Sequence, residues 1–299
     1  MSAAGPRPGR LRRGAFALAA LVAASCARGP EPIHVTAIRL ADGAPSEALR
    51  EAGLDETTLE VAARAALSGA GFKVGEGASP HRALLDVPSV RVLPGDSGPR
   101  LEVTVELELT PADPAARGGS RREVASASIA LGSALTPRDA WRAALVQATQ
   151  RSAEGLGLGV AAERKEVAGL VSDLTANDLR VREQAVRVLA ERKARAAVPA
   201  LVERLKQEEP RLTHRILGAL AQIGDERAVP ALIDVARGAD PTLTGRIVRF
   251  VGDIGGAEAE GFLLTVESGH PDPRVRKAAR EALDDLAVRA KEAAVAARH

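Results

Sequence analysis

The stretch VPALVERLKQEEPRLTHRILGALAQIGDERAVPALI, residues 198–233, begins and ends with the same motif and decides the fold of the C-terminal half. The motif VPAL at 198–201 returns at 229–232, which is 31 residues later. Apolar positions recur in three ladders at this period: Leu170, Leu201, Leu232, Leu263; Leu189, Leu220, Val251; and Ala185, Ile216, Ile247. Self-similarity at a fixed period of this length predicts a solenoid of stacked units.

Each unit is predicted to be a pair of helices. Apolar residues over 210–223 fall at spacings of three and four, which is typical of one helical stripe. Gly224 is expected to end that helix, and Asp225 to cap the next one, with Pro230 in its first turn. Such a unit must stack on its neighbours to bury both helices. We expect residues 165–174, a half unit, to cap the front of the array, and 273–298 to cap its rear.

The segments DLRVREQAVRVL (178–189), GDERAVPALI (224–233) and DPRVRKAAREAL (272–283) resemble the HEAT-repeat family, in its short branch known from phycobilisome lyase-like proteins. The resemblance implies an all-α solenoid of about four 31-residue units over residues 162–299. It also implies a protein-binding scaffold. Lys193 departs from the pattern, because glycine is expected there. An armadillo or tetratricopeptide array is the structural alternative, but the period is too short for the first and the aromatic residues of the second are missing.

The N-terminus has the layout of a secretory signal. Four arginines precede the apolar run GAFALAALVAAS (14–25), which is followed by Cys26. The run is shorter than the roughly 20 residues that a membrane-spanning helix needs. We therefore expect residues 1–25 to be removed. The arrangement resembles a bacterial lipobox, which implies that Cys26 carries the lipid and that residues 26–32 form a linker. Ordinary signal cleavage beside an incidental cysteine is the alternative.

The resemblance to lipoproteins implies an exported protein anchored to a membrane. Ala27 follows the cysteine, where aspartate would imply retention in the inner membrane, so the periplasmic face of the outer membrane is favoured.

The charge balance does not indicate a nucleic-acid partner. The chain has 41 basic and 39 acidic residues, and four arginines lie in the signal, which leaves 37 against 39. There is no tyrosine, and the chain lacks the rows of aromatic residues on which single strands stack. We expect no nucleic acid, no metal and no small-molecule cofactor.

Residues 33–158 lack the repeat and are predicted to form a small α+β domain. Strands are expected at 33–40, 83–93, 101–109 and 122–131, and the third alternates apolar and polar residues, so one face of its sheet should be solvated. Helices are expected at 55–71 and 136–155, closed by glycines and capped by Asp55 and Thr136. The glycine string 155–159 is interpreted as a linker between the domains.

No constellation of catalytic residues is found. None of the five histidines lies in a metal-binding motif or beside another at helical spacing, and Cys26 is the single cysteine. We therefore predict no catalytic residues and a non-enzymatic protein. Two alternatives stay open. One is an accessory or lyase-like enzyme of the repeat family, and the other is a structural envelope lipoprotein that acts through residues 33–158.

The candidate partner-binding face follows from the resemblance, because HEAT arrays line their concave side with second helices. The period places two rows of residues there, which we expect to form an acidic strip beside a basic one in contact with an envelope protein: Ser172, Glu203, Asp234 and Thr265; and Thr175, Lys206, Arg237 and Ser268.

Overall fold

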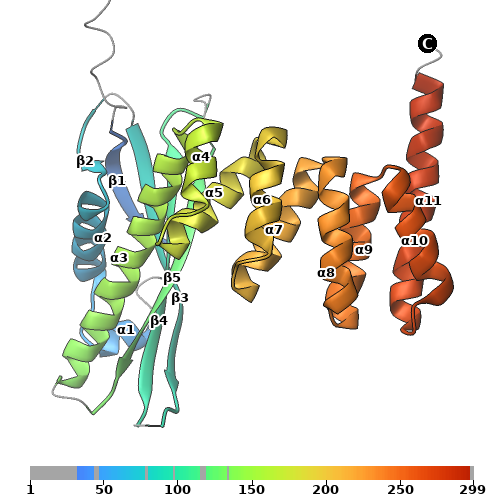
Figure 1. Ribbon diagram of the computed structural model, residues 1–299. Helices are drawn as coiled ribbons and strands as arrows, with labels where there is room; N and C mark the ends of the chain where they lie inside the picture. Colours follow the sequence, from blue (N-terminus) through green and yellow to red (C-terminus); the bar gives the residue numbers. More distant parts are fainter. Residues whose placement is uncertain are drawn as a thin grey trace, which may run out of the picture.

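A computed structural model of the protein describes residues 32–43, 47–77, 80–96, 98–114, 119–132 and 135–296. Its N-terminal part is a sheet covered by helices, and its C-terminal part is a row of helix pairs that extends away from the sheet (Figure 1). The predicted fold class, an α+β domain followed by helical repeats, is therefore confirmed. The signal segment and Cys26 lie outside the described residues.

The sheet has five strands in the order β2-β1-β3-β4-β5. Strand β1 is parallel to β2 and β3, whereas β3, β4 and β5 are antiparallel neighbours. The strand predicted at 101–109 is β4, and its five apolar side chains are buried while the alternate ones stay partly exposed. The short strand β2 was not predicted. The bounds of the strands are β1 His34–Leu40, β2 Lys73–Val74, β3 Pro80–Leu93, β4 Arg100–Pro111 and β5 Arg121–Ala130.

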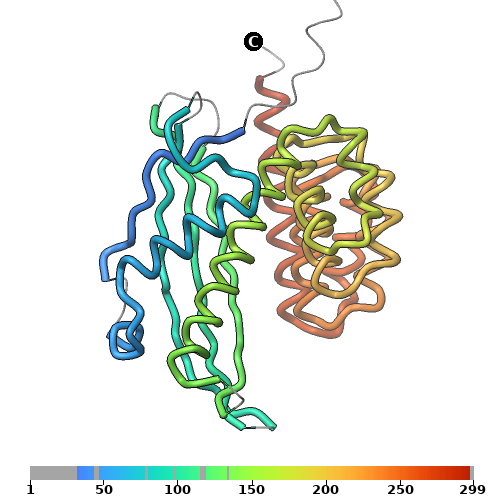
Figure 2. The backbone as a smooth tube through the Cα atoms, turned by 90° about the vertical axis from the view of Figure 1, so that its left-hand side faces the viewer, coloured from blue at the N-terminus to red at the C-terminus, as the bar shows by residue number. Residues whose placement is uncertain are grey.

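Two helices, α2 (Glu56–Gly69) and α3 (Pro137–Glu163), cover one face of the sheet, and a short helix α1 (Glu47–Glu51) precedes them. Both share one core cluster with the buried side chains of β4, and they lie side by side along the sheet (Figure 2). The expected caps are present, since Asp55 accepts a hydrogen bond from the backbone of Thr58, and Thr136 from that of Asp139. The layer of helices leaves the other face of the sheet open, as predicted.

Helix α3 does not end where the sequence predicted. It runs through the glycines at 155–159 to Glu163, so the interpretation of this string as a linker was wrong. The glycines instead allow close approach on three sides. A Cβ atom on Gly155 would lie 2.6 Å from the side chain of Glu123 on β5, one on Gly157 would lie 2.8 Å from the carbonyl oxygen of Ala70 after α2, and one on Gly159 would reach α5 at 3.4 Å.

The helix pairs form two layers. Helices α5, α7, α9 and α11, hereafter the first helices, pack against one another in chain order, and α3 packs against α5 at the front of this row. Helix α3 therefore acts as the first helix of the front unit, and residues 165–174 are not a lone half unit. The first helices are α5 Leu179–Glu191, α7 Pro210–Ile223, α9 Pro241–Ile254 and α11 Pro273–Ala296; the second helices are α4 Val167–Asp173, α6 Val198–Leu205, α8 Val229–Gly238 and α10 Ala257–Gly269, with 3-10 turns at Arg195–Ala197 and Glu226–Ala228.

The 31-residue ladders form the core of the array. Residues of all three ladders are fully buried and belong to one continuous cluster, as the repeat requires. Gly224 closes α7 with a left-handed backbone (φ 68°), as expected. Lys193 adopts the same left-handed conformation (φ 49°) at the equivalent position, although it has a side chain. The turn geometry is thus set by the stacking of the units.

One hydrogen-bonding position repeats at the start of every first helix. Arg182 donates to the carbonyl oxygens of Ala176 and Asn177, at 2.7 and 3.1 Å, and Arg276 donates to the equivalent loop before α11. The hydroxyls of Thr213 and Thr244 do the same in the two units between them. These side chains join each unit to the loop that leads into it. These four side chains were not predicted from the sequence.

The close contact at Gly157 can be tested against its neighbour Gly159. Replacing a helical glycine with alanine favours the helix by up to about 1 kcal/mol. Gly159→Ala should therefore keep or raise stability, because its neighbours are flexible side chains. Gly157→Ala should lower the free energy of unfolding by about 1–3 kcal/mol, because the new methyl group meets a backbone oxygen. Urea unfolding of both variants measures the difference, and equal effects would contradict the close packing at Gly157.

Candidate functional site

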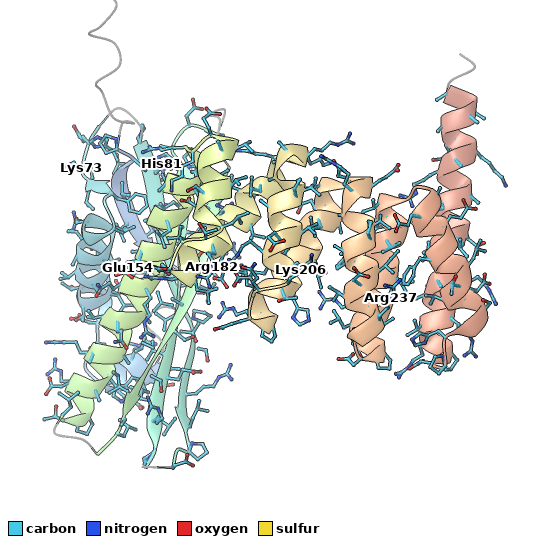
Figure 3. The ribbon with its side chains drawn as sticks, in the orientation of Figure 1. Lys73, His81, Glu154, Arg182, Lys206 and Arg237 are labelled. Carbon is cyan, nitrogen blue, oxygen red and sulfur yellow. The ribbon has the colours of Figure 1, made fainter. Side chains whose placement is uncertain are left out.

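The structure places all eight predicted face residues at the surface. Ser172, Glu203, Asp234 and Thr265 lie on α4, α6, α8 and α10, and the second row lies on or just after the same helices. Each of the eight is exposed. Lys206 and Arg237 occupy successive units of the array (Figure 3). The period alone therefore places a candidate surface on the second helices.

Some polar and charged side chains of this face are paired with neighbours on the same helix. Arg237 donates to Asp234 at 2.7 Å, so the two rows neutralise each other at α8. Glu203 accepts a hydrogen bond from Gln207 at 2.9 Å. The hydroxyls of Thr175, Thr265 and Ser268 donate to backbone carbonyls of their own helices. The acidic and the basic row are thus joined by one ion pair at α8, while Glu203 and Lys206 stay exposed at α6.

The described residues contain no group of three or more histidine, cysteine, aspartate or glutamate side chains that could hold a metal ion. Of the histidines, His81 is buried, and His270 accepts a hydrogen bond from the backbone of Asp272 at the start of α11. Among the described helices none is both long and apolar enough to cross a bilayer.

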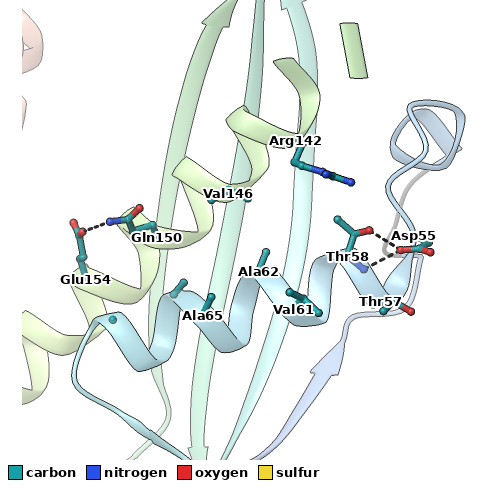
Figure 4. A pocket seen from close by; sticks show the side chains of 12 residues that line it. Asp55, Thr57, Thr58, Val61, Ala62, Ala65, Arg142, Val146, Gln150 and Glu154 are labelled. Atoms are coloured by element: carbon teal, nitrogen blue, oxygen red, sulfur yellow. Dashed lines mark hydrogen bonds between the residues drawn. The ribbon is translucent and has the colours of Figure 1, made fainter. Parts of the chain in front are cut away.

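A large hollow lies between α2 and α3, on the side facing away from the sheet. Its volume is about 760 Å³, and Ala62, Ala65 and Gly69 line it from α2 while Val146 lines it from α3 (Figure 4). Arg142 and Asp55 stand near one end and Glu154 at the other. This groove was not predicted from the sequence. The signal was the run of small residues on one face of α2, which keeps the two helices from filling the space between them.

A second cleft lies where the two domains meet. It has a volume of about 490 Å³ between β5, α3 and α5. Glu163 at the end of α3 accepts from Arg121 on β5 at 2.9 Å and from Arg187 on α5 at 3.2 Å. Arg187 also pairs with Glu191 at 2.7 Å. One carboxylate thus bridges the sheet and the first helix of the array.

Burial raises the pKa of Glu123 in this cleft, although the guanidinium groups of Arg187 and Arg215 act in the opposite direction. Its side chain packs against Gly155, and its backbone carbonyl accepts from the hydroxyl of Ser152 at 2.7 Å. A carboxyl group with a raised pKa favours the folded state only where it is protonated. Glu123 therefore destabilises the junction at neutral pH.

Glu123→Gln should raise the melting temperature at pH 7, because the amide removes the cost of a partly buried charge while keeping the shape. The gain should shrink as the pH falls from neutral toward about 4 and should be absent below that, where glutamate is protonated in both the folded and the unfolded state. Thermal unfolding at several pH values measures this. A gain that is constant with pH would show that the charge of Glu123 is not its source.

The helical array is similar to a known family of repeats. Residues 167–244 match the family model described as HEAT repeats. This segment consists of HEAT repeats. The match begins at α4 and ends within α9, so it covers the units that the VPAL motif defines.

Among solved structures, a minor lipoprotein from Acinetobacter baumannii is similar over 44% of this chain and 94% of its own, at 14% identity and a TM-score of 0.26. A likeness of this size carries no argument about function. No curated protein matches the chain.

Proposed function

We propose that this protein is a lipid-anchored scaffold of the bacterial cell envelope whose HEAT repeats bind a partner protein. It is exported, held by Cys26 at the periplasmic face of the outer membrane, and non-enzymatic. The match of residues 167–244 to HEAT repeats carries the proposal, because such repeats in general mediate contacts between proteins.

The architecture supports a scaffold in a second way. Because α3 belongs to both the sheet core and the front of the array, the array extends from the sheet domain without a linker at 155–159 (Figure 1). A partner bound to the second helices would be held at a fixed distance and angle from the sheet domain. Ser172, Glu203, Asp234 and Thr265, with the second row beside them, are the proposed contact residues.

The lipid anchor is tested with Cys26→Ser. Each buried methylene of an acyl chain contributes about 0.8 kcal/mol to membrane binding, so several chains hold a protein durably. The wild-type protein should sediment with membranes, and the variant should appear in the soluble periplasmic fraction. Incorporation of labelled palmitate should be lost in parallel. A variant that still sediments with membranes and keeps the label would contradict the anchor.

The proposed face is tested with the double variant Glu203→Lys/Asp234→Lys. Both residues are exposed, so the fold should tolerate the change. Capture of the partner from detergent-solubilised envelopes should fall by about tenfold or more, because two charges in the contact reverse sign.

A matched control is Asp42→Lys/Glu76→Lys, which makes the same change of charge at exposed positions of the sheet domain. It should leave capture unchanged. If the control weakens capture as much as the test variant does, the effect is one of net charge and the second helices are not the contact face.

A further inference from the structure

The first helices carry an excess of positive charge, in contrast to the second helices. Helix α7 has two arginines and no acidic residue, and α10 has three glutamates and no basic residue. Several of these cations recur at positions related by the repeat, namely Arg180, Arg211 and Arg274; Arg215 and Arg246; and Arg187 and Arg249.

Between α5 and α7, the array supplies its own carboxylate for these cations. The side chain of Glu183 on α5 is only 12% exposed and lies between the two helices. It pairs with Arg211 at 3.2 Å and with Arg215 at 3.5 Å, both from α7. A groove between neighbouring first helices can therefore hold one carboxylate between arginines.

Between α9 and α11 the position equivalent to Glu183 has no carboxylate. The repeat places Gly245 where α5 has Glu183, and Arg274 where α7 has Arg211. A cavity of about 230 Å³ lies at this point, and Gly245, Arg274 and Ala278 line it. A Cβ atom on Gly245 would find its nearest neighbour 4.0 Å away, so the space beside it is open.

Two further arginines line this groove, Arg246 and Arg249, both on α9. Within the described part of the chain, the side chain of neither makes a hydrogen bond or an ion pair, which fits their exposure. The acidic residue that lines the groove, Asp272, is already occupied. It accepts from the backbone of Arg274 at 2.7 Å and from its guanidinium at 3.1 Å. The one carboxylate that lines the groove is thus taken up by Arg274, and Arg246 and Arg249 are left without a carboxylate partner.

We propose that the groove between α9 and α11 binds a carboxylate side chain from an acidic segment of a partner protein. The incoming carboxylate takes the place that Glu183 fills between α5 and α7. Arg246 and Arg249 hold it, because the planar guanidinium fork matches a carboxylate, while Arg274 stays paired with Asp272 at the edge of the groove. Arg211 and Arg215 on α7 share the single carboxylate of Glu183, so one net positive charge remains there for a further acidic residue of the segment.

The surroundings favour an acidic protein segment over the other polyanions. Phe250 and Phe262, the aromatic residues of the array, pack against its core and offer no platform for stacking bases. Among the described residues of the first helices, the large apolar side chains that stand exposed are Val288 and Val295. Both lie in the second half of α11, at least about 15 Å along the helix from Ala278, so nothing beside the groove would insert into a bilayer.

This site goes beyond the proposed function, since it lies on the other layer of helices and names the chemistry of a ligand. It shares with that function only the assumption that a protein is bound. A direct assay with a defined peptide therefore separates the two. If the peptide does not bind while envelope capture persists, the groove proposal is wrong and the scaffold proposal stands.

The probe is a fluorescent peptide of about 10 glutamates, which can extend to about 35 Å and so cross three helices spaced by about 10 Å. Binding to the full chain is followed by fluorescence anisotropy, with a glutamine peptide of equal length as the neutral reference. The glutamate peptide should bind and the glutamine peptide should not. Binding should weaken as salt is raised. Failure of the glutamate peptide to bind overturns the proposal.

The sharpest variant is Gly245→Glu, which restores the carboxylate that α5 has at this position. It should weaken binding by about tenfold or more, because the groove then neutralises itself. It should also raise the melting temperature, since glutamate favours a helix more than glycine does, so lost binding cannot be attributed to unfolding. Gly245→Gln fills the same space without charge and should weaken binding by less than about threefold. Equal loss in both variants would exclude charge recognition.

A second pair of variants tests the location. Arg246→Gln/Arg249→Gln should weaken binding by about tenfold or more, and Lys206→Gln/Arg237→Gln, which removes two charges from the second helices, by less than about twofold. Equal effects would show attraction to net charge alone. Vesicles containing phosphatidylglycerol and a single-stranded DNA serve as competitors. If either binds more tightly than the peptide and is sensitive to Gly245→Glu, the ligand is a membrane or a nucleic acid and the proposal is overturned.

Discussion

The arrangement of the whole protein depends on the packing of α3. This helix of 27 residues lies on the sheet, beside α2, and against the first helix of the array. It can do so because its glycines remove side chains on the sides where β5, the end of α2 and α5 approach. Glu163 at its end then joins Arg121 and Arg187 across the junction. The two domains therefore share one structural element, and the direction of the array is set inside the core of the sheet domain.

The array was predictable from the sequence, and the junction was not. The ladder Leu170, Leu201, Leu232, Leu263 repeats because each unit buries the same positions against its neighbour, so a local pattern reports a tertiary contact. The glycines at 155–159, in contrast, are a local pattern that does not report the tertiary contacts. Glycine disfavours a helix by about 1 kcal/mol, which predicts a break, and only the packing on three sides makes it favourable here. No pattern within α3 encodes those partners.

The same distinction applies to the candidate surfaces. The period was sufficient to place the eight residues of the second helices at the surface. The spacing of three residues between Asp234 and Arg237 also places them on one helix face, so their ion pair could have been predicted from the sequence and was not. The groove between α9 and α11 could not be found from the period alone. Its chemistry depends on which residue of one helix meets which residue of the next, and the pairing of Glu183 with Arg211 supplied that correspondence.

Regular and irregular positions of a repeat array have different physical roles. The leucine ladder and the hydrogen bonds made by Arg182, Thr213, Thr244 and Arg276 recur in successive units, because every unit must stack and must fix the loop before it. The position of Glu183 instead becomes His214 and then Gly245, while basic residues persist around it. Stacking does not require that change, since each unit contacts only its neighbours. Between α9 and α11 this change leaves Arg246 and Arg249 without a carboxylate partner, because Asp272 pairs with Arg274. The α9/α11 groove is therefore chemically different from the α5/α7 groove beside the sheet domain, where Glu183 lies between two arginines.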